Sequence, residues 1–463
     1  MKKKDFFNSD TITAIATPSG EGAIGIIRIS GELTLHIIKN LFKSRKHVKA
    51  FKSHSLYYGD INDTSGKTID NVMLAYMKSP KTYTGENMAE IYTHGSSGVM
   101  QAVLKQVIQA GARPAQKGEF TRRAFLNGKM DLLQAEAVLD LIKSDTEASR
   151  QQAMSHLKGL LSEYILGIKE KLLQVKSHLE VMIDFPEEDV KPKGVLELGI
   201  ILQAAHDETA YILNSYEHAK IIKEGIKVAF IGKPNVGKSS IFNAMLGESR
   251  AIVTEHPGTT RDYIQESINY QGKKIVLIDT AGLRKSEELV EKLGIEMTKT
   301  LIKQADINAI VIDPLKKVSL EEELLVIQGI DMQKVIVLIN KIDVCKDIEE
   351  IKRIRTLFSP YQVFTISAKT KQGLDELERA ISLYQTKSDI EGNLVISRER
   401  HKQAMEHTEL ALRNAIELLA QQAFPEIIAE EVDSAIMAIS ELTGEITPED
   451  ILDKIFSEFC IGK

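Results

Sequence analysis

The segment GKPNVGKS at residues 232–239 limits the fold of this chain more than any other feature. It follows the apolar run KVAFIG and leads into SIFNAML, which is the strand, loop and helix setting of a phosphate-binding P-loop. In such a loop the glycines let backbone N–H groups close around a phosphate, and Lys238 places a positive charge beside the β- and γ-phosphates. Ser239 offers a hydroxyl to Mg²⁺. A Gly-rich turn that arose by chance is the alternative interpretation.

Three more apolar runs, KKIVLID, INAIVID and KVIVLIN, follow with helical segments between them, so we predict four buried strands in a mainly parallel sheet. The flanking regions differ. Residues 1–120 mix short apolar strands with Gly, Ser, Thr and Pro turns, whereas residues 121–223 and 387–463 have helical periodicity. We therefore predict a multidomain chain with an N-terminal α+β domain, a discontinuous helical domain and an α/β nucleotide-binding domain inserted at residues 224–386.

Composition restricts the class of protein. The chain of 463 residues is too long for one hydrophobic core, and a net charge of -6 argues against coating nucleic acid by charge alone, so any RNA contact should be local. Two cysteines, Cys345 and Cys460, are too few for a disulfide framework and favour a reducing compartment. We find no signal peptide and no apolar run approaching about 18 residues, so we expect a cytoplasmic protein without a membrane span.

Motifs downstream of the P-loop identify the nucleotide. DTAG at 279–282 ends a strand, where Asp279 can hold the Mg²⁺ shell and the Gly282 N–H can contact the γ-phosphate. NKID at 340–343 closes another strand, and Asp343 can accept both the N1–H and the N2 amino group of guanine, a donor pair that adenine lacks. SAK at 367–369 fits the loop whose backbone N–H reaches guanine O6. Together the motifs predict a GTP site. Its predicted binding residues are Asn235, Val236, Gly237, Lys238, Ser239, Ser240, Asp279, Gly282, Asn340, Lys341, Asp343, Ser367, Ala368 and Lys369.

The segment PGTTRD at 257–262 lies where a switch loop should present a threonine to Mg²⁺ and the γ-phosphate. Thr260 is our first choice and Thr259 the second, and a plain Thr-rich turn is the alternative. The residue after DTAG is Leu283, so the glutamine that orients the attacking water in small signalling GTPases is missing. Glutamates at 287, 288 and 291 could replace it, although their spacing alone is more typical of solvated helix charges. Asn235 could help to hold a monovalent cation.

Sequence motifs outside the nucleotide-binding domain indicate a family. TYTGE at 82–86, GEFTRRAFLNGKMDLLQAEAV at 118–138 and FCIGK at 459–463, with GTTRD and the motifs above, resemble the MnmE (TrmE) family of tRNA uridine-5-carboxymethylaminomethyl modification GTPases. This family lies in the TrmE-Era-EngA-YihA-Septin-like superfamily, and the resemblance covers essentially the whole chain. Lys117 departs from the family pattern, in which a proline usually precedes GEFT, and this puts the local loop geometry in doubt.

The resemblance implies a potassium-activated GTPase that forms a homodimer and works with the FAD-dependent partner MnmG (GidA) in a heterotetramer or larger complex. The pair would add an aminomethyl or carboxymethylaminomethyl group to C5 of the wobble uridine of certain tRNAs. The carbon would come from 5,10-methylene- or 5-formyl-tetrahydrofolate bound to the N-terminal domain, and FAD would be on the partner only. GTP hydrolysis would then drive conformational switching.

The resemblance also implies roles for individual residues. Potassium would be held by the Asn235 side chain and by backbone around Thr254, His256 and Thr259, magnesium by Ser239 and Thr260, and the water would be oriented by Glu291. The folate pocket would involve Arg28, Glu86, Lys129 and Lys463. These residue types suit a folate, whose glutamate tail pairs with a cation and whose pterin N–H edge pairs with a carboxylate. Cys460 could be a nucleophile or proton donor in uridine chemistry, or only a small residue in the folate pocket.

Two other classes of protein are alternatives to this interpretation. A ribosome-assembly GTPase, which is a binding switch without chemistry on RNA, shares GxxxxGKS, DTAG and NKxD, and a KH-like or second G domain would favour it. A folate-dependent methyltransferase that also uses GTP would be supported by a flavin bound to this chain. We find no GxGxxG in a strand-to-helix turn, so any flavin should belong to the partner.

Overall fold

The computed structural model describes residues 10–45, 50–63, 65–184, 193–248, 264–279, 300–316, 330–384 and 394–463. Two compact units are present: residues 1–139, 156–206 and 407–463 form one, and residues 140–155 and 207–406 form the other. Among the described residues no helix combines the length and the apolar character needed to cross a lipid bilayer.

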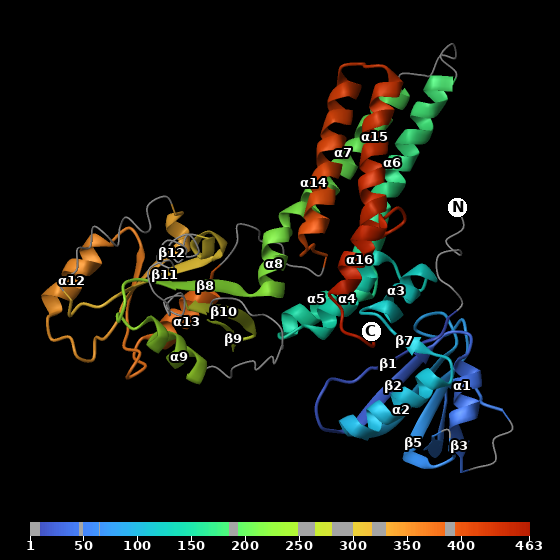
Figure 1. The fold of residues 1–463 in the computed structure, drawn as a ribbon. Helices are drawn as coiled ribbons and strands as arrows, with labels where there is room; N and C mark the ends of the chain where they lie inside the picture. The colour runs from blue at the N-terminus through green and yellow to red at the C-terminus, as the bar shows by residue number, and fades with distance from the viewer. Residues whose placement is uncertain are drawn as a thin grey trace, which may run out of the picture. The chain divides into compact units, whose positions relative to one another are not determined.

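The first unit begins with a seven-stranded sheet in the order β3-β4-β5-β6-β2-β1-β7. Side chains alternate along β2: Ile27 and Ile29 enter a core formed with α1 and α2, whereas Arg28 and Ser30 project from the opposite face. This arrangement is the predicted α+β architecture (Figure 1). The elements are β1 (Ile12–Ile15), β2 (Gly22–Ser30), α1 (Thr34–Leu41), β3 (Phe42–Ser44), β4 (Ser55–Asn62), β5 (Thr68–Met77), β6 (Met88–Gly95), α2 (Ser97–Gln109) and β7 (Arg113–Pro114).

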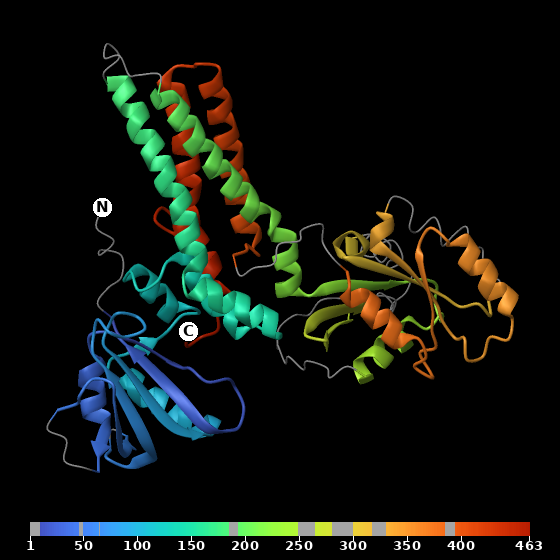
Figure 2. The ribbon, with the colours of Figure 1, turned by 180° about the vertical axis from the view of Figure 1, so that it is seen from behind.

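The stretches that precede and follow the nucleotide-binding domain in the sequence are mainly helical. On α6 the buried side chains recur every three or four residues, and this stripe packs against α15, which lies beside α6 in both views (Figures 1 and 2). Two stretches far apart in sequence thus pack together within the first unit. The helices of the two flanking stretches are α3 (Glu119–Leu126), α4 (Leu132–Ile142), α5 (Glu147–Leu157), α6 (Leu160–Asp184), α7 (Lys193–Asn214), α8 (Tyr216–Glu224), α14 (Glu399–Ala420), α15 (Pro425–Thr443) and α16 (Glu449–Ser457).

The second unit contains a six-stranded sheet in the order β13-β12-β11-β8-β10-β9. All strands are parallel except β9, which runs antiparallel to β10. Helices α9 and α13 cover one face and α12 covers the other (Figure 2). The elements are β8 (Ile226–Ile231), α9 (Lys238–Glu248), β9 (Ile264–Tyr270), β10 (Lys273–Asp279), β11 (Ile307–Ile312), β12 (Val335–Ile339), α12 (Ile348–Leu357), β13 (Gln362–Thr365) and α13 (Leu374–Ser382).

The four predicted buried strands are all present as β8, β10, β11 and β12, but the sheet has six strands. The two additional strands, IQESINY and QVFT, are the outermost ones. An edge strand is less covered than a central strand and so lacks the continuous apolar run by which we recognised the other four. The parallel core of the sheet agrees with the prediction.

Candidate functional site

The P-loop connects the end of β8 to the start of α9, and its backbone has an unusual conformation. Gly232, Asn235 and Gly237 have φ angles of 145°, 63° and 104°. A Cβ on Gly237 would lie 2.2 Å from Asn340 Nδ2, so only glycine fits there. The Lys238 ammonium donates to the carbonyl oxygens of Gly232 at 2.8 Å and Lys233 at 3.0 Å, which places it inside the loop. A cation within a loop at a helix N-terminus forms a cradle for phosphate.

An oxygen pair suited to magnesium lies beside this cradle. Ser239 Oγ donates to Asp279 Oδ2 at 2.7 Å. Asp279 ends β10, which pairs in parallel with β8, so the shared edge of the sheet brings the carboxylate to the P-loop. A hydroxyl and a carboxylate are hard ligands of the kind that Mg²⁺ prefers, so these residues fit the ion.

Loops after β12 and β13 complete the nucleotide site. The buried Asn340 donates through Nδ2 to Val236 O at 3.0 Å and accepts at Oδ1 from Ala368 N at 3.1 Å. Ser367 Oγ donates to Asp343 Oδ1 at 2.7 Å, while the Asp343 side chain stays exposed. The structure therefore joins the P-loop, NKID and SAK segments, and it places exposed Ser240 on α9 and exposed Lys369 after SAK.

Sequence reasoning missed Asp313, which follows β11 and is 2% exposed. Its Oδ2 accepts from Lys341 Nζ at 2.7 Å, and the same ammonium donates to Asn235 O at 3.0 Å. Lys316 Nζ also reaches Pro234 O at 3.3 Å. Three successive carbonyls of the P-loop, 234 to 236, are thus held by Lys316, Lys341 and Asn340, from the loops after β11 and β12. The available signal was an aspartate at the end of the apolar run INAIVID.

Some predicted site residues lie within the part of the chain that the structure describes and others lie outside it. Asn235 and Ser239 are described, and Asn235 is exposed. The predicted site residues outside the described part of the chain are Thr254, His256, Thr259, Thr260, Gly282, Glu287, Glu288 and Glu291.

The C-terminal FCIGK segment lies against the N-terminal domain. Gly118 N donates to Cys460 O at 3.5 Å and Phe120 N donates to Lys463 O at 3.1 Å. Lys117 forms an isolated antiparallel bridge with Ile461, so the residue that departs from the family pattern takes part in this contact through its backbone. Residues separated by more than 300 positions therefore share one surface.

Arg28 contacts this C-terminal segment from β2. Its Nη1 donates to Gly462 O at 3.1 Å and its Nε donates to Glu90 Oε1 at 2.9 Å. The guanidinium also lies 5.8 Å from the Tyr83 ring centroid and 5.6 Å from that of Phe120. Burial and the charge of Arg28 lower the pKa of Lys463. Arg28 and Lys463 therefore lie near one another, with Glu90 as the counter-charge of Arg28.

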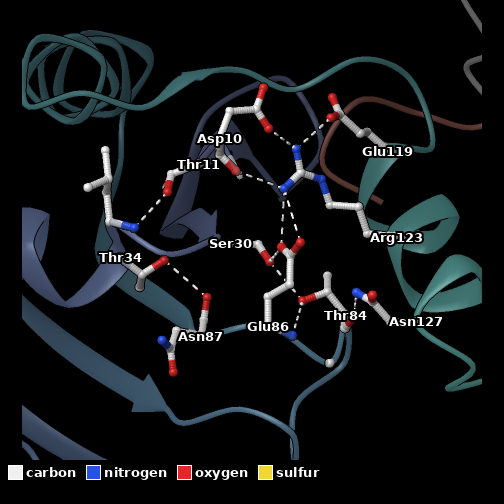
Figure 3. A network of polar contacts seen from close by, with 12 residues as sticks. Asp10, Thr11, Ser30, Thr34, Thr84, Glu86, Asn87, Glu119, Arg123 and Asn127 are labelled. Carbon is white, nitrogen blue, oxygen red and sulfur yellow. Dashed lines mark hydrogen bonds and ion pairs between the residues drawn. The ribbon is translucent and has the colours of Figure 1, made fainter. Parts of the chain in front are cut away.

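The TYTGE loop between β5 and β6 carries Glu86 (Figure 3). Glu86 Oε2 accepts from Ser30 Oγ at 2.7 Å, and Ser30 lies on the same face of β2 as Arg28. Lys129 Nζ donates to Pro80 O at 3.1 Å, at the start of this loop. Neither Cys345 nor Cys460 forms a disulfide, and Cys460 is exposed. The four predicted pocket residues thus belong to one connected region, although they come from four separate segments.

Comparisons with known proteins cover the whole chain. A family model described as GTP-binding protein TrmE N-terminus matches residues 11–129, and one described as MnmE helical domain matches residues 132–460. Proteins named tRNA modification GTPase MnmE from Alkaliphilus metalliredigens and Acetivibrio thermocellus are each 40% identical, over 99% of this chain and 100% of the relative. The one from Clostridioides difficile is 39% identical over the same shares. The fold, the motifs and these matches agree, and the chain belongs to the MnmE family.

Proposed function

We propose that this chain is a potassium-activated GTPase that modifies C5 of the tRNA wobble uridine together with an FAD-dependent partner, using a one-carbon unit of tetrahydrofolate. The observation that carries the proposal is the convergence of Lys238, Asp279 and Asn340 with the SAK loop on one cradle. It occurs in a chain that is 40% identical over its length to proteins named tRNA modification GTPase. We also propose a cytoplasmic homodimer that joins MnmG in a heterotetramer or larger complex.

In the nucleotide site, Lys238 would neutralise phosphate charge and Asp343 would select guanine by accepting its N–H pair. Ser239 and Asp279 would hold Mg²⁺, which supplies charge neutralisation when it is bound. Asn235 has an exposed amide in the left-handed turn of the loop, and amide oxygen is a hard ligand suited to K⁺. The family resemblance supports the remaining roles. Potassium would also be held by Thr254, His256 and Thr259, magnesium by Thr260, and the attacking water would be oriented by Glu291.

In the N-terminal pocket, Arg28 and Lys463 would pair with the glutamate tail of a folate, and Glu86 would accept hydrogen bonds from the pterin. Lys129 lies at the loop that carries Glu86 and would close this side of the pocket. The exposed thiol of Cys460 would act on the uridine as a nucleophile or proton donor. If Cys460 is only a small pocket residue, Cys460→Ala keeps tRNA modification, whereas a chemical role predicts its loss.

GTP hydrolysis in potassium and in sodium buffers of equal ionic strength tests the nucleotide part of this proposal, with Asn235→Ala measured beside the unaltered protein. We expect a potassium-specific rise in rate that Asn235→Ala abolishes. Equal rates in the two salts would contradict cation activation and favour a ribosome-assembly switch, the second candidate function.

A further inference from the structure

One side of α3 carries polar residues of the GEFTRRAFLNGK stretch that have no role in the function proposed above. Glu119, Arg123 and Asn127 are spaced four residues apart, so they line up along the helix and its C-cap. Glu119 and Arg123 are each 3% exposed and pair with one another at 3.0 Å. Asn127 Nδ2 donates to Thr84 O at 2.7 Å, two residues before Glu86. We call these three residues the α3 stripe.

Arg123 ties the α3 stripe to the carboxylate of Glu86 (Figure 3). Its Nη1 donates to both Glu86 oxygens at 3.2 Å and to Asp10 O at 3.0 Å. Its Nη2 donates to Asp10 Oδ1 at 2.6 Å and to Glu119 Oε1 at 3.0 Å. Because these acceptors belong to three different segments, the planar guanidinium has a fixed position.

Further hydrogen bonds fix the rest of the TYTGE loop. Glu86 N donates to Thr84 Oγ1 at 3.2 Å, and Thr82 Oγ1 donates to Glu86 O at 2.7 Å. Ser30 Oγ contacts both Thr84 Oγ1 and Glu86 Oε2 at 2.7 Å. The Glu86 side chain nevertheless stays 27% exposed. A carboxylate has about four acceptor positions, so Glu86 keeps some for a ligand while its orientation is set.

The charges of this cluster leave a negative excess. Three carboxylates, Asp10, Glu86 and Glu119, face two guanidiniums, Arg113 and Arg123. Burial would raise the pKa of Asp10 and of Glu119, but hydrogen bonds from the two arginines outweigh it and lower both values. Arg113 pairs with Asp10 and Glu119, and Arg123 pairs with all three carboxylates, so the cluster keeps one net negative charge. Asp10 and Glu86 are its partly exposed members, and a net negative charge around Glu86 suits a ligand that donates N–H groups.

We propose that Arg123 is a positioning residue of the folate pocket, which fixes the Glu86 carboxylate for the N–H edge of a pterin, with Asn127 holding the backbone of the same loop. The inference rests on the proposed folate site and adds to it the role of the α3 stripe. A glutamate that is already oriented loses little rotamer freedom when the ligand binds, whereas a mobile one would weaken binding.

Isothermal titration calorimetry of 5-formyl-tetrahydrofolate with the full-length protein tests this role. We expect Arg123→Gln to raise Kd about tenfold and Arg123→Lys to raise it less, because lysine keeps the charge but not the two-pronged geometry. Glu86→Gln should weaken binding at least as much as Arg123→Gln. The double variant should then bind as Glu86→Gln does, since Arg123 acts through Glu86. If the two losses multiply in the double variant, Arg123 has no positioning role.

Arg123→Gln also leaves Asp10 and Glu119 without their partner and can unfold the domain, so a milder variant is needed. Asn127→Ala removes only the bond to the Thr84 carbonyl, and we expect it to raise Kd about threefold with a nearly unchanged Tm. Arg45→Gln, which breaks an exposed pair with Asp60, is the matched charge control and should bind like the unaltered protein. Unchanged affinity in both Asn127→Ala and Arg123→Lys would overturn the inference. No binding by the unaltered protein would instead reject the folate site and the inference with it.

Discussion

The nucleotide site and the proposed folate site of the N-terminal domain bring their residues together in different ways. In the nucleotide site the residues follow β8, β10, β12 and β13, so they meet because parallel strands end at one edge of a sheet. In the pocket, Arg28 contacts Gly462 across 434 positions, and Glu86 is held by Arg123 of α3. The first site depends on backbone geometry, and the second depends on ion pairs and on contacts with the FCIGK segment. The two sites should therefore be sensitive to different substitutions.

The largest expected effect tests the dependence of the nucleotide site on its backbone. Gly237→Ala would put a Cβ 2.2 Å from Asn340 Nδ2 at a φ of 104°. We expect the affinity for a fluorescent GTP analogue to fall about a thousandfold, or about 4 kcal/mol. Gly247→Ala on α9 is the matched control, because its Cβ would meet nothing within 4 Å. Binding of Gly237→Ala within threefold of the unaltered protein would show that backbone geometry does not decide this site.

The next prediction concerns the charge network of the N-terminal domain. Glu119→Gln removes a partner of both Arg113 and Arg123 at a buried position, and we expect a loss of about 3 kcal/mol in the free energy of unfolding at pH 7. Urea denaturation followed by a probe in this domain measures it.

The pH dependence of the same unfolding sharpens the test. The folded-state pKa values of Asp10 and Glu119 are lowered from 3.8 and 4.5. Their contribution to stability should be complete above the unfolded values and be lost as the pH falls through the lower folded values. Glu119→Gln should show a shallower loss of stability in acid. An identical acid profile in the variant and the unaltered protein would mean that Glu119 does not contribute through its charge.

A smaller loss of nucleotide affinity is expected when the ion pair between Lys341 and the buried Asp313 is weakened. Asp313→Asn weakens the contact that holds Lys341 against the Asn235 carbonyl. We expect GDP affinity, measured by calorimetry, to fall about tenfold. Lys316→Ala removes the longer contact to Pro234 O at an exposed position and should change affinity less than threefold. Equal effects of the two substitutions would contradict a special role for the buried pair.

The sequence predicted well what depends on neighbouring residues. The P-loop, the strand-end motifs and the long helices follow from local periodicity and from glycines at set positions, and the structure has them where the pattern indicated. The edge strands IQESINY and QVFT were missed because their side chains are only partly covered, which removes the apolar run that reveals a central strand.

Only the tertiary structure decided which distant side chains meet. Nothing in the local pattern of GEFTRRAFLNGK shows that Arg123 binds Glu86 and Asp10, or that Asp313 holds Lys341. The same limit applied to the pocket, whose residues were named from the family resemblance and not from their spacing. The physical reason is that periodicity reports which face of an element is buried, whereas a contact between segments depends on how whole elements pack and on which charges must be paired once water is excluded.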